Sequence, residues 1–238
     1  TVADNLTVTG TLSADSKDAI LGKVEGTNFT GSLLVGHSTT GTLNAASNNT
    51  GVGIDALDAL TSGDDNIGIG YQAGSAIAGG SSNVVMGKQA GDAITSGGSN
   101  VAIGALALSA AATDSNVGVG AYALHSVTGS NNVGVGQNAG VSIAAGDNNI
   151  CMGYLAGDNI TTGSGNVVIG KADVSSATGD DQFSISDGED GSVVWMTGDS
   201  SAKLTFPGAL QVSGAVTVGV DDTGLDVKLF GASAGAYM

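Results

Sequence analysis

The chain has 238 residues, of which 41 are glycine and only 4% are aromatic, so it lacks the large side chains that fill a conventional globular core. Its apolar content of 41% is too high for a disordered chain, and a thin buried layer of small and medium aliphatic residues is expected. Six basic residues against 22 acidic ones give a net charge of −16, which disfavours nucleic acid as a partner, and no apolar run has the length needed for membrane insertion.

Residues 1–31 precede the regular part of the chain and are predicted to form an N-terminal strand or linker segment. Within it, residues 5–12 read Asn-Leu-Thr-Val-Thr-Gly-Thr-Leu, in which every second residue is apolar or glycine. Such alternation is typical of a half-buried β-strand. Because the chain lacks an initial methionine and ends at Met238 in the middle of a pattern, we expect it to be a segment of a longer polypeptide.

Residues 32–186 are dominated by one repeat. Each copy reads Asn, apolar, small, apolar, Gly, and successive copies start 16 or 17 residues apart. With a less regular copy at 32–36 and a decayed one at 182–186, there are about ten copies. The starting asparagines are Asn49, Asn66, Asn83, Asn100, Asn116, Asn132, Asn149 and Asn166. The closing glycines are Gly53, Gly70, Gly87, Gly104, Gly120, Gly136, Gly153 and Gly170.

The columns of this repeat predict how the copies stack. Apolar positions two residues apart, such as Val101 and Ile103, share one face of a strand, and we expect each to lie over its counterpart in the coil beneath. The residue between them is small, so the other face is expected to meet a close neighbour or to remain bare. The glycine is expected at a corner with positive φ or close backbone approach. The asparagines are expected to form a side-chain ladder and to tolerate the corner backbone themselves.

After the corner, an alanine and then an aliphatic residue recur, as in Ala73 and Ile77, and we predict a second short strand there. A period near 17 residues is too short for a helical repeat. The predicted fold class is therefore all-β, a parallel β-solenoid of β-roll or β-helix type. Ten rungs stacked at about 4.8 Å would form a rod of roughly 45 to 50 Å.

A single chain of this kind buries little apolar surface. Three or four aliphatic side chains per rung contribute about 1.5 to 3 kcal/mol each, against roughly 1 to 2 kcal/mol of backbone entropy per residue. A small-residue face left in water would add nothing. We therefore expect several chains to associate around an axis, most naturally as a homotrimer, which would bury that face and cover strand edges.

Few residues suggest catalysis. His37 and His125 lie in different copies without a Ser, Cys or carboxylate partner at a meaningful spacing. Cys151 occupies the small position of the repeat and is predicted to be a packing residue. A polysaccharide depolymerase would need paired carboxylates and aromatic platforms on inserted loops, which the uniform spacing does not provide. We predict a non-enzymatic chain with no catalytic residue and no cofactor.

Acidic turns are the best candidates for a metal site. Acidic residues cluster at 187–190, and Asp pairs occur at 64–65, 180–181 and 221–222, where they could offer oxygen ligands to Ca²⁺. Neither the EF-hand spacing nor the nonapeptide calcium-roll pattern is present. Solvated turns are therefore favoured, and no metal ligand is predicted.

Residues 187–238 are predicted to be a β-rich C-terminal segment that leads into further sequence. Trp195 is expected to plug the end of the solenoid, where the repeat decays. Tyr71, Tyr122 and Tyr154 follow the corner glycines and are expected to pack there; the alternative is an exposed stripe that contacts glycans.

Two groups of trimeric fibres resemble this sequence. Residues 100–104, Asn-Val-Ala-Ile-Gly, resemble the rungs of β-roll heads in trimeric autotransporter adhesins. Residues 66–74 are similar to repeats in tail-fibre and structural proteins of phages, notably marine ones. Residues 5–12 and 210–216 look like strands common in phage fibres, and residues 220–231 resemble a segment of marine phage virion proteins.

The resemblance to phage proteins implies a structural tail-fibre or virion-appendage protein, located on the virion, that acts as a rigid trimeric spacer and contributes to host attachment. Its implied partners are further copies of itself, other virion tail proteins, and a host cell-surface glycan or protein receptor. The alternative is the head of a bacterial trimeric surface adhesin, which would also need a coiled-coil stalk and a membrane anchor. A polysaccharide depolymerase is the least favoured reading.

Overall fold

The structure is a computed structural model and describes residues 22–26, 29–35, 44–211 and 213. The strand predicted at 5–12, His37 and the Asp pair at 221–222 lie outside these residues. Strands and turns make up the described part of the chain, which contains no helix. Accordingly, no described helix could cross a membrane. The chain divides into two compact units, 1–207 and 208–238, and nearly all described residues belong to the first.

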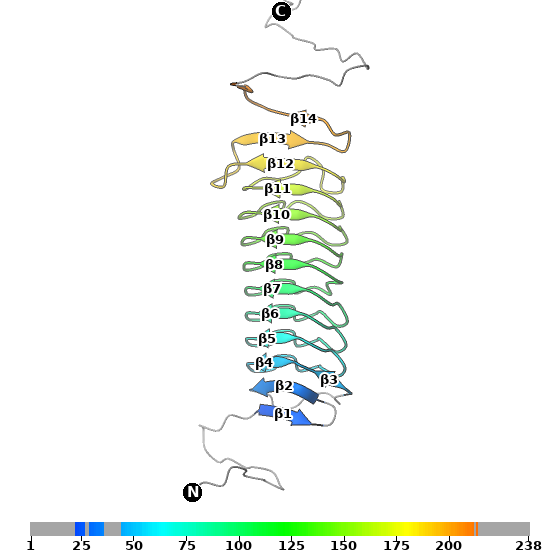
Figure 1. The fold of residues 1–238 in the computed structure, drawn as a ribbon. Coiled ribbons are helices and arrows are strands. Elements are labelled where there is room, and N and C mark those ends of the chain that lie inside the picture. Colours follow the sequence, from blue (N-terminus) through cyan, green and yellow to red (C-terminus); the bar gives the residue numbers. More distant parts are fainter. Residues whose placement is uncertain (1–21, 27–28, 36–43, 212, 214–238) are drawn as a thin grey trace, which may run out of the picture. The chain divides into compact units, whose positions relative to one another are not determined.

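The first unit is a parallel β-solenoid of about nine turns, so the predicted fold class is confirmed (Figure 1). Its column of parallel strands runs from β2 (Phe29–Val35) to β12 (Phe183–Ser186). Each rung between them contributes one strand of three residues. These strands are β4 (Thr50–Val52), β5 (Ile67–Ile69), β6 (Val84–Met86), β7 (Val101–Ile103), β8 (Val117–Val119), β9 (Val133–Val135), β10 (Ile150–Met152) and β11 (Val167–Ile169).

Every pairing in this column places identical positions of the repeat side by side. Val101 pairs with Val117, and Val117 pairs with Val133. The same register holds from β4 to β11. The continuous column predicted for the repeat is therefore present.

Antiparallel strands flank the parallel column at both ends. β1 (Gly22–Gly26) pairs with β2, while β13 (Val194–Gly198) lies between β12 and β14 (Leu204–Thr205). A short parallel pairing also joins β3 (Ala46–Ser47) to β2. The prediction that Trp195 plugs the end is wrong, because its side chain is 58% exposed on β13. The reversal of strand direction ends the repeat instead, since antiparallel pairing replaces the parallel stacking of coils.

The second strand predicted in each rung is also wrong, because that segment is a series of turns. Gln72 and Gly74 both have left-handed backbones, with φ of 55° and 61°, which a strand does not accommodate. Ala73 lies buried between them. The turns still bond from rung to rung, since the Gly74 N–H donates to the carbonyl oxygen of Ala90 at 2.8 Å. Hydrogen bonds thus join the rungs on both sides of the coil.

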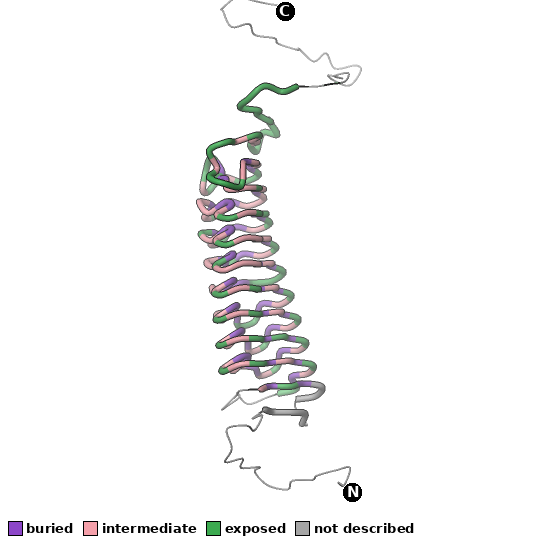
Figure 2. The backbone as a smooth tube through the Cα atoms, turned by 90° about the vertical axis from the view of Figure 1, so that its left-hand side faces the viewer, coloured by how far each residue is buried: buried purple, intermediate pink, exposed green. Residues whose placement is uncertain are grey.

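The face of each strand that points into the coil is the opposite of the predicted one. In β7 the small middle residue, Ala102, is fully buried, whereas Ile103 is 38% exposed. The same alternation recurs in the other three-residue strands, and buried segments repeat at matching places along the rod (Figure 2). The small residues therefore line the inside of the coil, and the larger aliphatic residues lie on its surface.

At most steps between rungs the core is filled by one side chain, which comes either from a turn or from the strand of the next rung. Leu57 projects from a turn and fills the space over Gly68, where a Cβ would lie 2.8 Å from Leu57 Cγ. One rung later the sizes are exchanged, and a Cβ on Gly74 would lie 2.9 Å from Cγ2 of Val85. Further Leu-over-Gly steps are Leu108 with Gly118 and Leu124 with Gly134, and further steps of the exchanged kind are Gly140 with Cys151 and Gly157 with Val168.

Candidate functional site

A column of asparagines ties the rungs together. Asn66 Nδ2 donates to Asn49 Oδ1 at 3.0 Å, and the same oxygen accepts the Asn66 backbone N–H at 2.9 Å. Asn66 Nδ2 also donates to the Gly80 carbonyl oxygen at 2.8 Å. Gln182 continues the ladder at the last rung. The fully buried members are Asn49, Asn66, Asn83, Asn100, Asn116, Asn132, Asn149 and Asn166.

The left-handed backbone near this ladder belongs to the residue before each asparagine. Asp65, Ser82 and Asn131 have φ of 58°, 62° and 60°, whereas no ladder asparagine has a positive φ. The prediction that the ladder asparagines adopt the corner backbone is therefore wrong, because the residue before each of them adopts it.

The glycines that close the strands have both predicted features. Gly70 has a φ of 132°, and a Cβ there would lie 2.6 Å from the carbonyl oxygen of Gly87 in the next rung. Positive φ recurs along the whole column: Gly53, Gly70, Gly87, Gly104, Gly120, Gly136, Gly153 and Gly170. Backbone conformation and close stacking both restrict this column to glycine.

A second ladder, which the repeat pattern did not predict, uses aspartate and serine. Asp147 Oδ1 accepts the Ser130 backbone N–H at 2.6 Å, and Ser164 Oγ accepts the Asp147 backbone N–H at 3.1 Å. Asp180 Oδ1 in turn accepts the Ser164 backbone N–H at 2.8 Å. Because serine separates the aspartates, carboxylates do not stack on adjacent rungs, where their repulsion would be strongest. The alternation of Asp and Ser at this position is the signal that could have revealed it.

The other polar candidates are occupied by local contacts. The Asp187 carboxylate accepts backbone N–H groups from Gly191 and Val193 at 2.8 and 3.0 Å. No group of three His, Cys, Asp or Glu side chains in the described ranges could hold a metal ion. His125 Nδ1 lies 3.4 Å from Ser126 Oγ, and its ring centroid is 5.5 Å from that of Tyr122.

Cys151 has the packing role that the sequence predicts. It is fully buried, and burial is the main cause that raises the pKa of its thiol to about 12. A thiol that stays protonated at neutral pH is a poor nucleophile.

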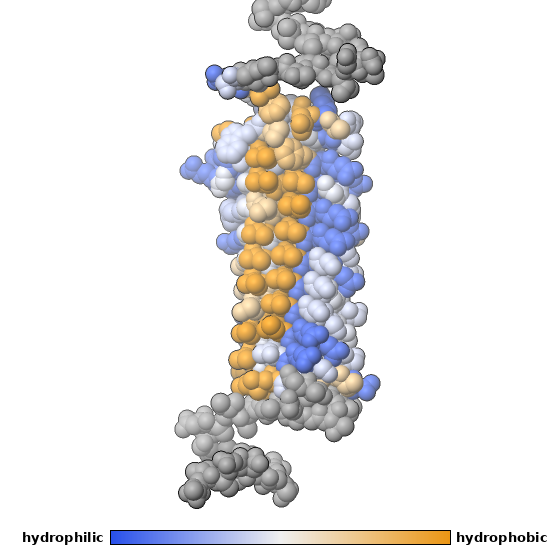
Figure 3. Space-filling model, viewed as in Figure 1, coloured by the Kyte–Doolittle hydropathy of each residue, from blue (hydrophilic) through white to orange (hydrophobic). Residues whose placement is uncertain are grey.

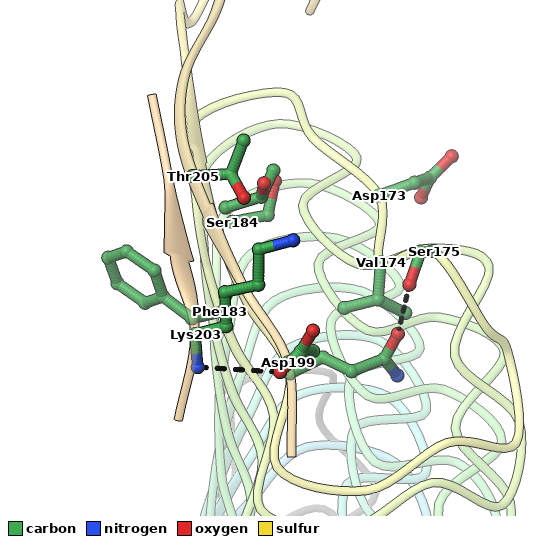
Figure 4. Close-up of a pocket in the computed structure, with 11 residues that line it drawn as sticks. Asp173, Val174, Ser175, Phe183, Ser184, Asp199, Lys203 and Thr205 are labelled. Carbon is green, nitrogen blue, oxygen red and sulfur yellow. Dashed lines mark hydrogen bonds between the residues drawn. The ribbon is translucent and has the colours of Figure 1, made fainter. Parts of the chain in front are cut away.

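Two small cavities lie near the C-terminal end of the coil. One, of about 170 Å³, is lined by polar groups that already bond one another: Ser175 Oγ donates to Gln182 Oε1, and the Lys203 backbone N–H donates to Asp199 Oδ1 (Figure 4). The other, of about 350 Å³, is lined by Asp158 and Asp173 among others. Burial and the neighbouring Asp173 raise the pKa of Asp158 to about 6.

The largest unexplained feature is an exposed apolar face made by the outward residues of the strands. Figure 3 shows it as two parallel columns running along the rod. Its side chains keep substantial exposure, with Ile69 at 37% and Met152 at 44%. The first column contains Thr50, Ile67, Val84, Val101, Val117, Val133, Ile150 and Val167. The second contains Val52, Ile69, Met86, Ile103, Val119, Val135, Met152 and Ile169.

Charged residues lie along the two sides of the apolar face rather than on it. Two residues before a strand, Asp65 and Asp181 form what we call the acidic edge. Two residues after a strand, Lys88 and Lys171 form the lysine edge. Lys171 Nζ also lies 5.4 Å from the ring centroid of Tyr154, a cation–π contact.

The tyrosines share the lysine side of the face and pack only in part. Tyr71, Tyr122 and Tyr154 keep 46%, 41% and 47% of their surface exposed. The packing predicted for them at the corner therefore covers about half of each residue.

Comparison of the chain with protein-family models, with curated proteins and with solved structures gives no match. The features that bear on function are the geometry of the rod and its apolar face.

Proposed function

We propose that this chain is a structural segment of a phage tail fibre or similar virion appendage, in which it serves as a rigid trimeric spacer and contributes to host attachment. The observation that carries the proposal is the unbroken, in-register column of strands from β2 to β12. A fibre segment must hold a binding element at a fixed distance, and a column of this kind supplies both length and direction.

Stiffness follows from the number of bonds that join each rung to the next. A strand pairing, the turn hydrogen bonds and the buried asparagine ladder connect neighbouring rungs at separate places around the coil. Bending the rod would stretch bonds on one side, and the ladder bonds are buried where water cannot replace them.

Self-association is supported by the apolar face. Outward side chains such as Ile67 and Ile103, each 38% exposed, leave on the order of 1,000 Å² of apolar surface, whereas the largest patch on a typical monomer is about 300 to 600 Å². The sequence predicted association because it would bury the face of small residues. In the structure those residues are inside the coil, and the exposed aliphatic face is the reason instead. A homotrimer around an axis along the rod would cover the face on every chain.

Three measurements test the proposal. Native mass spectrometry of the purified chain is expected to give three copies, and negative-stain electron microscopy is expected to show straight rods. Immunogold labelling with antibodies to the chain is expected to mark appendages of phage particles. Labelling of bacterial surfaces instead would support the adhesin alternative, and a monodisperse single chain would count against the trimer.

A further inference from the structure

We infer that neighbouring copies pack in parallel and without axial shift, with their apolar faces toward a common axis and the lysine edge of each copy against the acidic edge of the next. This inference deepens the self-association proposed above and rests on it. The occupant of the apolar face is therefore a second copy of this chain.

The repeat distance of the apolar face favours the same chain as its partner. Side chains in each column recur once per rung, at the strand spacing of about 4.8 Å. A second copy carries the same spacing, so its side chains can interdigitate along the whole column, as they do in steric zippers. The available area, on the order of 1,000 Å², also matches the roughly 800 Å² per partner of a standard interface.

The charges at the two edges select the direction of packing. Rotation about an axis parallel to the rods brings the lysine edge of one copy beside the acidic edge of the next. An antiparallel arrangement brings acidic edge to acidic edge and lysine edge to lysine edge. Since like charges at close range repel, the parallel arrangement is the favourable one for these four edge residues.

The heights of the charged residues agree with zero axial shift. Lys88 follows β6, one rung from Asp65, which precedes β5. Lys171 follows β11 and is likewise one rung from Asp181, which precedes β12. Both contacts between copies therefore span about 4.8 Å along the rod, within reach of a lysine side chain. Closed cyclic symmetry requires the same absence of shift, because a shifted arrangement would not close.

The relative direction of neighbouring copies can be measured with spin labels on introduced cysteines. Ser62→Cys and Thr162→Cys place these cysteines at equivalent exposed positions that lie six rungs apart. The native Cys151 stays unlabelled because it is buried and its thiol pKa is about 12. Pulsed electron–electron double resonance is expected to give the same short distance between chains for either label alone. Assemblies mixed from the two labelled proteins should add a distance that includes about 29 Å of axial offset. A short distance in the mixed assembly alone would overturn the parallel arrangement.

Charge exchange tests the edge contacts. Lys88→Glu is expected to weaken assembly about tenfold, as measured by sedimentation, and adding Asp65→Lys in the same chain should restore it. Lys203→Glu makes the same charge change at an exposed lysine beyond the last parallel strand, just before β14, and is expected to leave assembly unchanged. Equal weakening by Lys88→Glu and Lys203→Glu, or no restoration in the double variant, would reject the edge pairing.

The outcomes separate this inference from the proposed function. If the unmodified protein has the mass of a single chain, both the proposed trimer and this inference are contradicted. A three-chain mass with antiparallel label distances, or without response to charge exchange, removes only the inference and leaves the spacer role in place.

Discussion

Leu57 fills the space over Gly68 of the next rung so closely that a Cβ at position 68 would lie 2.8 Å from Leu57 Cγ. One rung further on, Gly74 and Val85 exchange these roles. Most steps of the core are therefore filled by one medium-sized side chain, which comes either from the turn below or from the strand above.

Exchanging the sizes at one step tests this packing. Gly68→Val alone is expected to destabilise the chain by roughly 1 to 3 kcal/mol through overpacking, and Leu57→Gly alone by about 2 to 5 kcal/mol through a cavity. The double variant recreates the arrangement of Gly74 and Val85 and should recover most of the loss in urea unfolding. Additive losses would contradict the packing, and Gly208→Ala, where no atom lies within 4 Å, is the control.

Removing one ladder asparagine should weaken the rod at its centre. Asn100→Ala removes the bonds to the Thr113 carbonyl oxygen and to the Asn116 backbone N–H, and one of the two bonds that Asn83 Oδ1 accepts from residue 100. Each unsatisfied buried group costs about 1 to 3 kcal/mol. Hydrogen exchange should lose protection around this rung first, whereas the exposed Thr162→Ala should leave it intact. Unchanged exchange in Asn100→Ala would mean that the ladder does not stabilise the rod.

Adding one methyl group at a corner should disturb the stacking. In Gly104→Ala the new Cβ would lie about 2.5 Å from the carbonyl group of Gly120, on a backbone whose φ is 132°. Both the contact and the φ disfavour alanine, so the thermal midpoint is expected to fall by several degrees. Gly188→Ala, with nothing within 4 Å, should unfold like the unmodified chain, and equal midpoints for both variants would contradict the role of the corner.

Neighbouring residues of one strand should respond differently to the same substitution. Ile103→Glu places a charge on the apolar face and is expected to give folded single chains. Ala102→Glu places it inside the coil, where it lacks a partner, and is expected to prevent folding. Circular dichroism combined with native mass spectrometry distinguishes the two results. Loss of folding in Ile103→Glu would show that the apolar face belongs to the core of a single chain.

Stability should fall as the pH rises through the titration of Asp158. Burial and Asp173 raise its pKa from 3.8 to about 6 in the folded chain, so the folded state holds this proton more tightly than the unfolded state. Its contribution is therefore lost progressively between about pH 4 and pH 6. Asp158→Asn should lack this loss and gain stability over the unmodified chain across that range. A constant difference in urea midpoint would contradict the shift.

The fold could be predicted because the period and the register do not depend on which face of a strand is inside. The orientation could not, because Val101 and Ile103 are larger than Ala102 and larger aliphatic residues are usually buried. The core is filled instead by turn residues such as Leu57, whose backbone has a φ of 57°. Positive φ at a leucine has no signal in composition, so the sequence pattern predicts a strand where the structure has a turn.

The surface features were predictable to different degrees. The alternation of Asp and Ser at the second ladder was visible in the sequence, but its hydrogen bonds require the register between rungs. The exposed apolar face could be recognised only after the strand orientation was known.

The two ways of filling the core mean that neighbouring rungs must be complementary in the size of the side chains that meet between them. The rung of Asn116 has Gly118 on one side and Leu124 on the other, so a tandem duplicate of it would fit against itself. A duplicate of the rung of Asn66 would bring Gly74 against Gly68, with no medium-sized side chain at that step. Lengthening of this rod by gene duplication is thus favoured at certain rungs, or for blocks of rungs whose outer residues are complementary in size.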